Sequence, residues 1–457
     1  MSRIDRSMLP TPGPSAPFRF PSIHHSKLAN GLEIRAVEHR NVPVVSAVLL
    51  VPVGTAADPS ERHGLAAFTA DLLDEGSGGR SALEISDEIA RYGADLDVDV
   101  GPDSITVALT TLTRFTAPVL GLLAEMAIAP NLASGDIERV RKLRLERLRQ
   151  LRDHAPVVAE RALVRLLYGH HPYGHLGLGN ESALEATTIE DLRAFHKGAF
   201  VPSGATLVIV GDASSEDLTA AAVAAFGAWK TTAVAPGLDR DAGIQPPPLI
   251  PERRLAVVPR PGAAQSELRI GHVCASRDTP DYHALVLLNM ILGGQFVSRV
   301  NLNLRQDKGY TYGVRTGFDL RRGLGPFVLQ TSVQTEVTAD AAREALRELD
   351  DIRGRRPITA DELALARASV TRGYPRGFET AQQVARSVAQ LALHRLPDSY
   401  FEEFVPRVEA VTLDEVTRVA AEYLDPARMV TLAVGDHDRI ASTLTPLNLG
   451  EPVVVSA

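Results

Sequence analysis

Three carboxylates on one predicted helix have the spacing that a hard cation would require. Asp71, Asp74 and Glu75 stand three and four residues apart, so they share a helix face. Carboxylates of this kind bind Ca²⁺ or Mg²⁺ when carbonyl or water ligands complete the shell. No such partners are evident in the sequence, and a solvated acidic helix end before Gly76 is the favoured interpretation.

Histidine and cysteine are the other metal-ligating types. His170, His171 and His175 lie close together, but His-Pro-Tyr-Gly is typical of a turn and favours a structural role. His63 has no partner at ligand spacing. Cys274, the single cysteine, lies in an alternating apolar stretch that predicts burial rather than reactivity. We therefore predict no metal site and no resident cofactor in this chain.

Arg305 and Tyr312 are a different chemical pair. A guanidinium and a phenol can donate hydrogen bonds to a peptide carbonyl and to the oxyanion that forms when water attacks it. Taken from chemistry alone, the pair has a plainer reading. Arg305 would form a surface ion pair with Asp307 or Glu336, and Tyr312 would be a half-buried strand aromatic.

The elements that must position these side chains follow from hydrophobic periodicity. Runs of strands followed by runs of helices occur twice, which predicts a duplicated α+β architecture with mainly antiparallel sheets. The predicted strands are 32–37, 42–53, 96–100 and 104–111, then 255–258, 267–275, 312–319 and 327–334. The predicted helices are 64–73, 83–92, 135–152 and 157–167, then 282–292 and 298–306.

An internal repeat supports the duplication. Residues 188–212 and 412–436 have equal length, and Thr188 and Thr412 occupy the same position in each copy, as do Gly211-Asp212 and Gly435-Asp436. Each copy predicts a helix capped by the threonine, then a Pro-containing turn and an apolar strand. We predict an N-terminal extension at 1–22, a first domain at 23–235, a Pro-rich linker at 236–252 and a second domain at 253–457.

Composition narrows the classes of function. The chain of 457 residues has 48 Lys and Arg against 56 Asp and Glu, a net charge of −8 spread along its length, which disfavours nucleic acid as a partner. The first twenty residues lack the apolar run of a signal peptide, and no apolar stretch is long enough to span a bilayer. We expect a cytoplasmic protein, or a periplasmic one if a leader was removed.

Four segments together resemble one family. They are VPVVSAVLLVPVGTAADP at 42–59, HGLAAFTADLLDEGS at 63–77, LLYGHHPYGH at 166–175 and LGGQFVSRVNLNLRQDKGYTYGV at 292–314. The chain resembles the insulinase (pitrilysin, inverzincin) family of zinc metallopeptidases over about residues 27–436. This resemblance also implies the duplicated half-domain.

The resemblance implies that this chain has lost the family's zinc-binding residues. The family's H-x-x-E-H helix binds zinc through two histidines and polarises water through the glutamate. Here the three positions fall on Ala67, Ala70 and Asp71, and the third-ligand position falls on Arg147, with Glu146 beside it. Alanine has no lone pair to offer, so the chain should not build the family's site and should not be a peptidase on its own.

The same resemblance gives a role to the retained pair. Arg305 and Tyr312 match the family motif L-R-x-x-x-G-x-x-Y, which implies that they reach the substrate across a closed chamber, and Tyr310 matches an apolar motif position instead. Gly293-Gly294 matches a glycine-containing stretch of the non-catalytic subunit of mitochondrial processing peptidase. That run is much shorter here, so a helix C-cap is the preferred interpretation.

Our leading hypothesis is a non-catalytic, substrate-binding subunit of a heteromeric zinc endopeptidase. A homologous partner with H-x-x-E-H would hold the zinc, and the two chains would enclose a chamber for unfolded peptides. The alternative is a structural or assembly protein that kept the fold without proteolysis, like the core subunits of the respiratory cytochrome bc complex. Peptide capture without cleavage is a third reading, and the sequence leaves homodimerisation of the isolated chain open.

Overall fold

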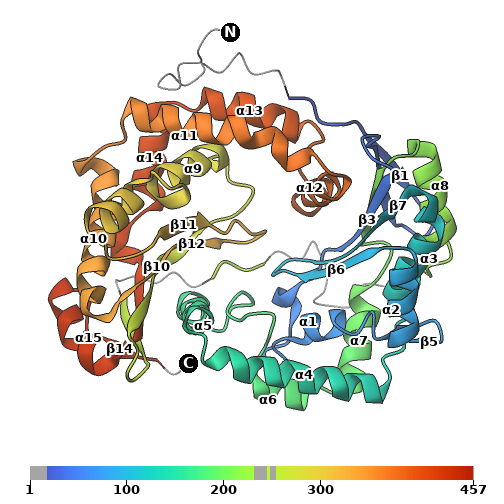
Figure 1. Cartoon of the computed structure of the whole chain (residues 1–457), viewed down its shortest axis with the longest axis horizontal. Coiled ribbons are helices and arrows are strands. Elements are labelled where there is room, and N and C mark those ends of the chain that lie inside the picture. The colour runs from blue at the N-terminus through green and yellow to red at the C-terminus, as the bar shows by residue number, and fades with distance from the viewer. Residues whose placement is uncertain (1–17, 231–243, 248–253, 456–457) are drawn as a thin grey trace, which may run out of the picture.

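The computed structural model describes residues 18–230, 244–247 and 254–455. Its two sheet-containing halves lie next to each other, with helices around both, as Figure 1 shows. This arrangement confirms the predicted α+β class. Within the described residues, no helix is long and apolar enough to cross a membrane.

The first sheet has six strands with a buried centre. Its central strands β3 and β8 are almost wholly apolar and buried, because helices cover both faces of the sheet. Strand β2 runs parallel to β8, and the other pairings are antiparallel. The order across the sheet is β1 (Ile23–Lys27), β2 (Glu33–Glu38), β8 (Thr206–Gly211), β3 (Val44–Val51), β7 (Ile105–Leu112) and β6 (Asp95–Val100).

The second sheet repeats this plan. Here β9 runs parallel to both β13 and β14, and the long antiparallel pair is β10 with β12. The order is β11 (Val314–Phe318), β12 (Gly325–Gln334), β10 (Gln265–Ala275), β13 (Val430–Gly435), β9 (Arg254–Pro259) and β14 (Val453–Val454). A further two-stranded ribbon pairs β4 (Gly76–Ser77) with β5 (Arg80–Ser81).

The sequence repeat becomes a structural repeat. Helix α7 (Ile189–Ala199) precedes β8, and helix α14 (Leu413–Tyr423) precedes β13. Thr188 and Thr412 cap these helices in matching capping boxes, accepting hydrogen bonds from the backbone N–H groups of Asp191 (3.1 Å) and Glu415 (3.2 Å). Both predicted N-caps are therefore confirmed.

The remaining helices surround the sheets. In the first half they are α1 (Leu65–Ala70), α2 (Ala82–Arg91), α3 (Thr116–Ile128), α4 (Ser134–Arg152), α5 (Ala155–Tyr168), α6 (Glu181–Ala186) and α8 (Ser215–Phe226). In the second half they are α9 (Tyr282–Asn289), α10 (Thr338–Asp350), α11 (Ala360–Gly373), α12 (Ala381–His394), α13 (Tyr400–Ala410) and α15 (His437–Leu444). Two helices predicted from the sequence are modified: 282–292 overlaps a π-helical segment, Met290–Gly294, and 298–306 overlaps another, Asn301–Asp307.

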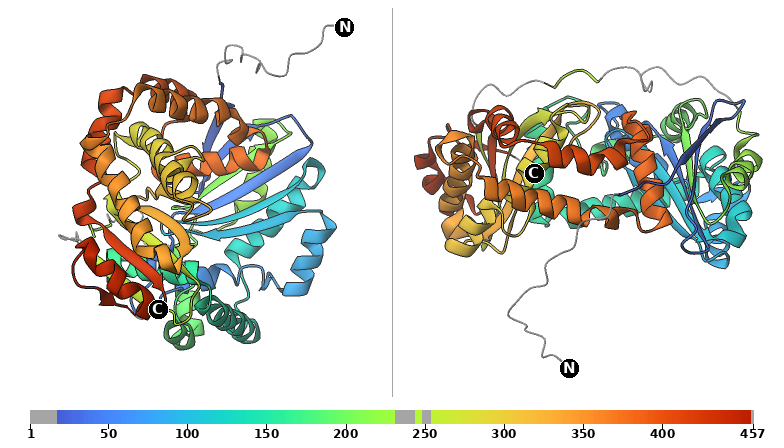
Figure 2. Two further views of the ribbon diagram at one scale, coloured as in Figure 1. Left: turned by 60° about the vertical axis from the view of Figure 1, so that its left-hand side comes forward. Right: turned by 90° about the horizontal axis from the view of Figure 1, so that it is seen from above.

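The two halves exchange helices. Helix α5 of the first half packs on β10 and β13 of the second sheet, and α12 of the second half packs on β3 and β8 of the first sheet. Figure 2 shows the orange helices of the second half extending towards the first sheet. The Tyr168 hydroxyl, at the end of α5, also donates to the Leu324 carbonyl at 2.9 Å.

The described part of the predicted N-terminal extension packs on the second half. Phe20 is 7% exposed, and its ring centroid lies 5.4 Å from that of Phe378 and 4.8 Å from that of Phe401. Residues 18–22 are therefore part of the packed fold, whereas residues 1–17 lie outside the described residues. Most of the predicted linker, 236–243 and 248–252, also lies outside them.

Candidate functional site: a helix without metal ligands and a polar cavity

Helix α1 lacks the expected metal ligands, but hydrogen bonds fix its first turn in place. The buried carboxylate of Asp58 accepts hydrogen bonds from the N–H groups of Gly64 (2.6 Å) and Ala66 (2.8 Å) at the helix start. Such a bond set satisfies amides that an α-helix leaves unpaired. Ala67 and Ala70 are buried on this helix and offer only methyl groups where the resemblance expects a histidine and a glutamate.

The third position of the H-x-x-E-H motif is Asp71, and its side chain forms an ion pair. Asp71 accepts a hydrogen bond from Arg144 of α4, whose guanidinium also donates to the Gly177 carbonyl at 2.8 Å. The Arg144 side chain is 8% exposed and that of Asp71 is 46% exposed. A guanidinium is always protonated and has no lone pair for a metal. These residues therefore do not fit a zinc ion.

Arg147 lies one turn along α4 from Arg144 and lines the same cavity of about 470 Å³ as Asp71 and Asp74. Edge strand β6 contributes Leu96 and Val98 to its wall. Arg147, the predicted third-ligand position, therefore lies beside the end of α1, but it adds a second positive charge to this cavity. Arg144, which makes the actual contact, was not predicted, since its role depends on the packing of α4 against α1.

The three acidic residues of this helix end line one cavity, but two of them, Asp71 and Glu75, are paired with arginines. Arg139 donates to Glu75, and burial followed by the neighbouring charge of Glu75 raises the pKa of Asp74. Within the described residues, no group of three or more His, Cys, Asp or Glu side chains is placed to hold a metal ion.

The histidines form a cluster that spacing did not reveal. His175 donates through Nε2 to Asp58 at 3.0 Å, and its ring stacks on that of His63 with centroids 4.0 Å apart. Burial, then the nearby His175, lowers the pKa of His63. His171 instead donates to the Gln245 carbonyl at 2.8 Å. The His175 contacts tie the turn at 170–175 to the start of α1, and only the three-dimensional fold brings His63 to His175.

Arg305 and Tyr312 lie in the second half. The Arg305 guanidinium carbon is 3.5 Å from the Phe296 ring centroid. Among the described residues it forms no ion pair with Asp307 or Glu336, so the alternative interpretation of Arg305 is wrong; Glu336 pairs with Arg439. Tyr312 is 98% exposed and precedes β11, which corrects both the predicted strand start at 312 and the half-buried alternative.

Neighbouring residues are explained by packing. Tyr310 packs against the second core, unlike Tyr312. Gly293 and Gly294 end a helical segment as predicted, but neither has the left-handed backbone of a glycine C-cap. A Cβ at Gly293 would lie 2.6 Å from the Thr316 side chain, so close approach to β11 explains this glycine. Burial raises the pKa of the Cys274 thiol to about 12, in keeping with an unreactive cysteine.

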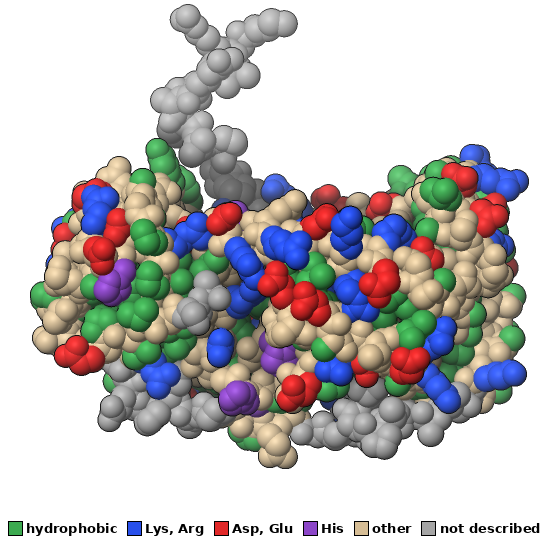
Figure 3. All heavy atoms as spheres, turned by 90° about the horizontal axis from the view of Figure 1, so that it is seen from below, with side chains coloured by type: hydrophobic (Ala, Val, Ile, Leu, Met, Phe, Trp, Pro, Cys, Tyr) green, Lys and Arg blue, Asp and Glu red, His purple; other side chains and the backbone are tan. Residues whose placement is uncertain are grey.

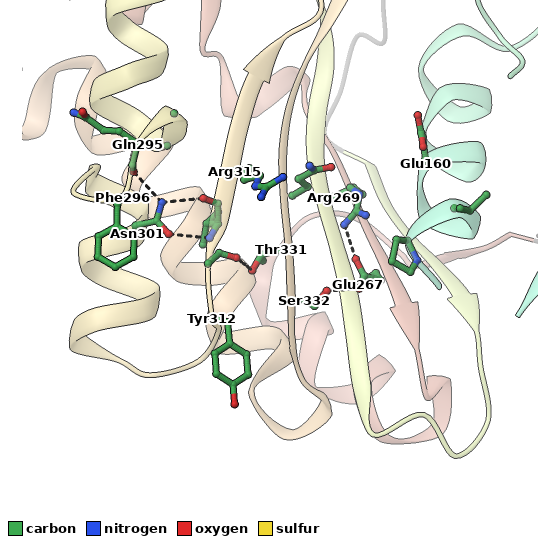
Figure 4. A pocket seen from close by; sticks show the side chains of 17 residues that line it. Glu160, Glu267, Arg269, Gln295, Phe296, Asn301, Tyr312, Arg315, Thr331 and Ser332 are labelled. Carbon is green, nitrogen blue, oxygen red and sulfur yellow. Dashed lines mark hydrogen bonds and ion pairs between the residues drawn. The ribbon is translucent and has the colours of Figure 1, made fainter. Parts of the chain in front are cut away.

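Tyr312 stands at the rim of a polar cavity of about 690 Å³. The cavity is formed by β10, β11, β12 and the start of α5. Asn301 shapes its side wall, because its side-chain amide exchanges two 2.9 Å hydrogen bonds with the backbone of Val314 in edge strand β11. Figure 4 shows the Tyr312 phenol directed away from the strands, with its hydroxyl free of the other labelled side chains.

The cavity floor carries a polar row across three strands. Arg315 of β11 pairs in register with Gln330 of β12, and Gln330 pairs with Arg269 of β10. Glu267 accepts from Arg269 at 2.8 Å, and Arg269 is buried, so this guanidinium is fixed in place. Residues of these types can donate hydrogen bonds to the carbonyls and carboxylates of an extended peptide.

Outside the cavities, charge is mixed. Figure 3 shows Lys and Arg side chains interspersed with Asp and Glu on the face seen from below. Side chains of both signs thus share this face.

Two family models match the chain. The model of the insulinase family (peptidase family M16) matches residues 35–179, and the model described as "Peptidase M16 inactive domain" matches residues 186–370. Among curated proteins, an uncharacterized zinc protease of Mycobacterium tuberculosis is 24% identical over 94% of this chain and 97% of its own length. The non-peptidase homolog YmxG of Helicobacter pylori is 20% identical over 79% of this chain and 82% of its own length.

Solved structures share the architecture. A peptidase M16 inactive domain from Pseudomonas fluorescens superposes with a TM-score of 0.83 at 25% identity, covering 90% of this chain and 98% of that one. A protease from Helicobacter pylori gives a TM-score of 0.85 at 20% identity, covering 91% of this chain and 100% of that one.

Proposed function

Because this chain belongs to the insulinase family of peptidases, we propose that it is the non-catalytic, substrate-binding subunit of a two-chain zinc endopeptidase. A homologous partner that carries H-x-x-E-H would hold the zinc, and this chain would add residues to the composite site. The similarity to a peptidase inactive domain and to a non-peptidase homolog supports the non-catalytic part.

One observation carries the proposal. The helix that should present zinc ligands has two buried alanines, and its third position is used by an ion pair with Arg144. Three protein ligands and an open position are the minimum for catalytic zinc, and this chain offers one carboxylate already bound to a cation. The second half, in contrast, keeps an exposed phenol at the rim of a polar cavity.

In this proposal Tyr312 and Arg305 act on the peptide rather than on the metal. The Tyr312 hydroxyl would donate to a peptide carbonyl and to the oxygen that becomes negative as water adds. Arg305, braced on Phe296, would contribute a positive charge near that oxygen. The cavity beside them would receive the adjoining residues of the unfolded substrate.

The test is reconstitution with a homologous H-x-x-E-H chain from the same source. The isolated chain should cleave no peptide, and the mixture should cleave an unfolded peptide. Tyr312→Phe should lower turnover of the complex by about 100-fold to 1000-fold, the usual cost of one lost oxyanion donor, without preventing assembly. Tyr310→Phe, two residues away, is the matched control and should leave turnover within a few-fold of the wild type.

A second candidate is a structural or assembly protein, which the similarity to a non-peptidase homolog favours. This candidate predicts that the chain forms a stable homodimer and that no H-x-x-E-H chain gains activity from it. Unimpaired turnover of the Tyr312→Phe complex would remove Tyr312 from the proposed mechanism. Chelator-sensitive cleavage by the isolated chain would overturn the subunit proposal.

A further inference from the structure

A third cavity lies where α9, the end of β11 and α12 meet. Its volume is about 310 Å³, within the usual range of small-molecule sites. One wall is apolar and includes Leu285, Val286 and Phe318. Arg277 and His394 also line the cavity, and none of its lining residues is an aspartate or glutamate. We name it the Arg277 pocket.

Arg277 is positioned without being neutralised. Its guanidinium carbon lies 3.7 Å from the Tyr282 ring centroid and 5.0 Å from that of Tyr400, and it donates to the Tyr400 hydroxyl at 2.6 Å. In the part of the chain that the structure describes, no carboxylate forms an ion pair with it. A guanidinium has five N–H donors in a planar fork, so donors remain for a ligand.

His394 is the other titratable group of the pocket. Burial, then the positive charge of Arg277 and to a smaller extent that of Arg322, lowers its pKa to about 4, against the opposing effect of Asp103. The imidazole is therefore neutral at pH 7, and one of its ring nitrogens can donate a hydrogen bond to an anion. A bound anion would favour the protonated ring.

We propose that the Arg277 pocket binds a monocarboxylate that carries a short aliphatic chain. The guanidinium would hold the carboxylate, and the apolar wall would take the chain. One uncompensated cation beside an apolar wall favours a single negative charge over a dianion. The volume equals that of roughly ten water molecules, which limits the ligand to a small acid or to the last residue of a peptide.

The pocket does not depend on the proposed peptidase role. It is formed by residues of the second half, and none of them belongs to the cavity beside Tyr312. Gln390 and His394 of α12 line it, and α12 packs on the first sheet, so an occupant would also stabilise the junction of the halves.

The experiment is calorimetric titration of the full chain with hexanoate, with hexanamide as its neutral match. Hexanoate should bind saturably and at least about tenfold more tightly than hexanamide. N-acetyl-leucine and N-acetyl-leucinamide form a second pair that mimics a peptide C-terminus. Preference for hexanoate would identify a free acid as the ligand, and preference for N-acetyl-leucine would identify a peptide end; either result supports the pocket.

Two variants and a control locate the site. Arg277→Gln should weaken carboxylate binding at least about tenfold, and Val286→Trp should block it by filling the cavity while leaving the charge in place. Arg372→Gln, an exposed arginine of α11, should change nothing. Near-ultraviolet circular dichroism checks that each variant is folded, and Val286→Trp keeps the test valid if Arg277→Gln unfolds.

Nuclear magnetic resonance gives a readout specific to the pocket. Saturating hexanoate should raise the titration midpoint of His394, identified by the signal missing in His394→Gln. Equal binding of acid and amide, binding unaffected by both variants, or an unmoved His394 midpoint despite binding would each overturn the proposal. The absence of saturable binding of both acids would overturn it as well.

Discussion

At the scale of single residues, Arg144 is the side chain that most clearly separates this chain from a zinc-binding one. It is buried, and Asp71 supplies its only carboxylate partner among the described residues. The sequence predicted the loss of ligands, because alanine can be read directly. It did not predict Arg144 as the replacement, because the resemblance pointed to Arg147 and only packing shows which turn of α4 contacts α1.

Asp71→Asn tests that ion pair. Removing one partner of a buried pair costs several kcal/mol, but Asp71 is half exposed, so we expect a loss of about 1–2 kcal/mol in the free energy of unfolding. Urea denaturation measures it. Asp136→Asn is the control, since its ion pair with Arg139 is exposed and should contribute about 0.5 kcal/mol or less. Equal effects of the two substitutions would contradict the structural role of Asp71.

His283 should make stability depend on pH. Burial, then the charges of Arg407 and Arg277, lowers its pKa from 6.5 to about 4. Between these values the unfolded chain binds a proton that the folded chain does not, so stability is greatest above about pH 6.5 and falls as the pH approaches 4.

The melting temperature of the wild type should therefore be lower at pH 5 than at pH 7, and the drop should be smaller in His283→Phe. The exposed residue His24 provides a control, and His24→Gln should leave the drop unchanged. A drop of the same size in His283→Phe would show that this imidazole does not titrate as described.

At the scale of elements, the internal repeat was the feature that the sequence predicted best. Thr188 and Thr412 cap matching helices because a hydroxyl at that position satisfies a free amide, a local effect that needs no tertiary information. The π-helical segments were missed, because an extra residue in a turn leaves little trace in periodicity. The start of β11 was misplaced for a related reason, since Tyr310-Thr311-Tyr312 alternates like a strand but lies outside one.

Thr412→Ala should cost about 1 kcal/mol in the free energy of unfolding, because the Glu415 amide loses its acceptor. Thr188→Ala should cost a similar amount, and the double variant should show about the sum, since the two caps lie in different halves. Thr417→Ala, in the middle of α14, should be near neutral. Chemical denaturation of the four variants would refute the capping role if Thr417→Ala were the most destabilising.

At the scale of the whole molecule, the exchanged helices α5 and α12 decide how the halves stay together. Patterning predicted α5, as 157–167, but it gave no bounds for α12 and did not show on which sheet either helix would pack, because an apolar face does not specify its partner. Val388 of α12 is fully buried with Val48 and Val208 of the first sheet. This contact crosses between the halves.

Val388→Asp should weaken that contact by about 3 kcal/mol or more, since it buries a charge without a partner. Scanning calorimetry should show a lower and broader transition as the halves unfold less cooperatively. Arg386→Gln, an exposed neighbour on α12, should leave the transition nearly unchanged. A sharp transition at the wild-type temperature in Val388→Asp would contradict the role of α12 as a link.

The central claim is that this family member cannot hold the metal on which the family's chemistry depends. The most direct measurement is the zinc content of the purified chain by elemental mass spectrometry after equilibration with zinc and removal of loosely bound ions. We predict well below one zinc per chain, unchanged in Asp71→Asn. One tightly held zinc per chain, lost on substitution of Asp71, would contradict the account.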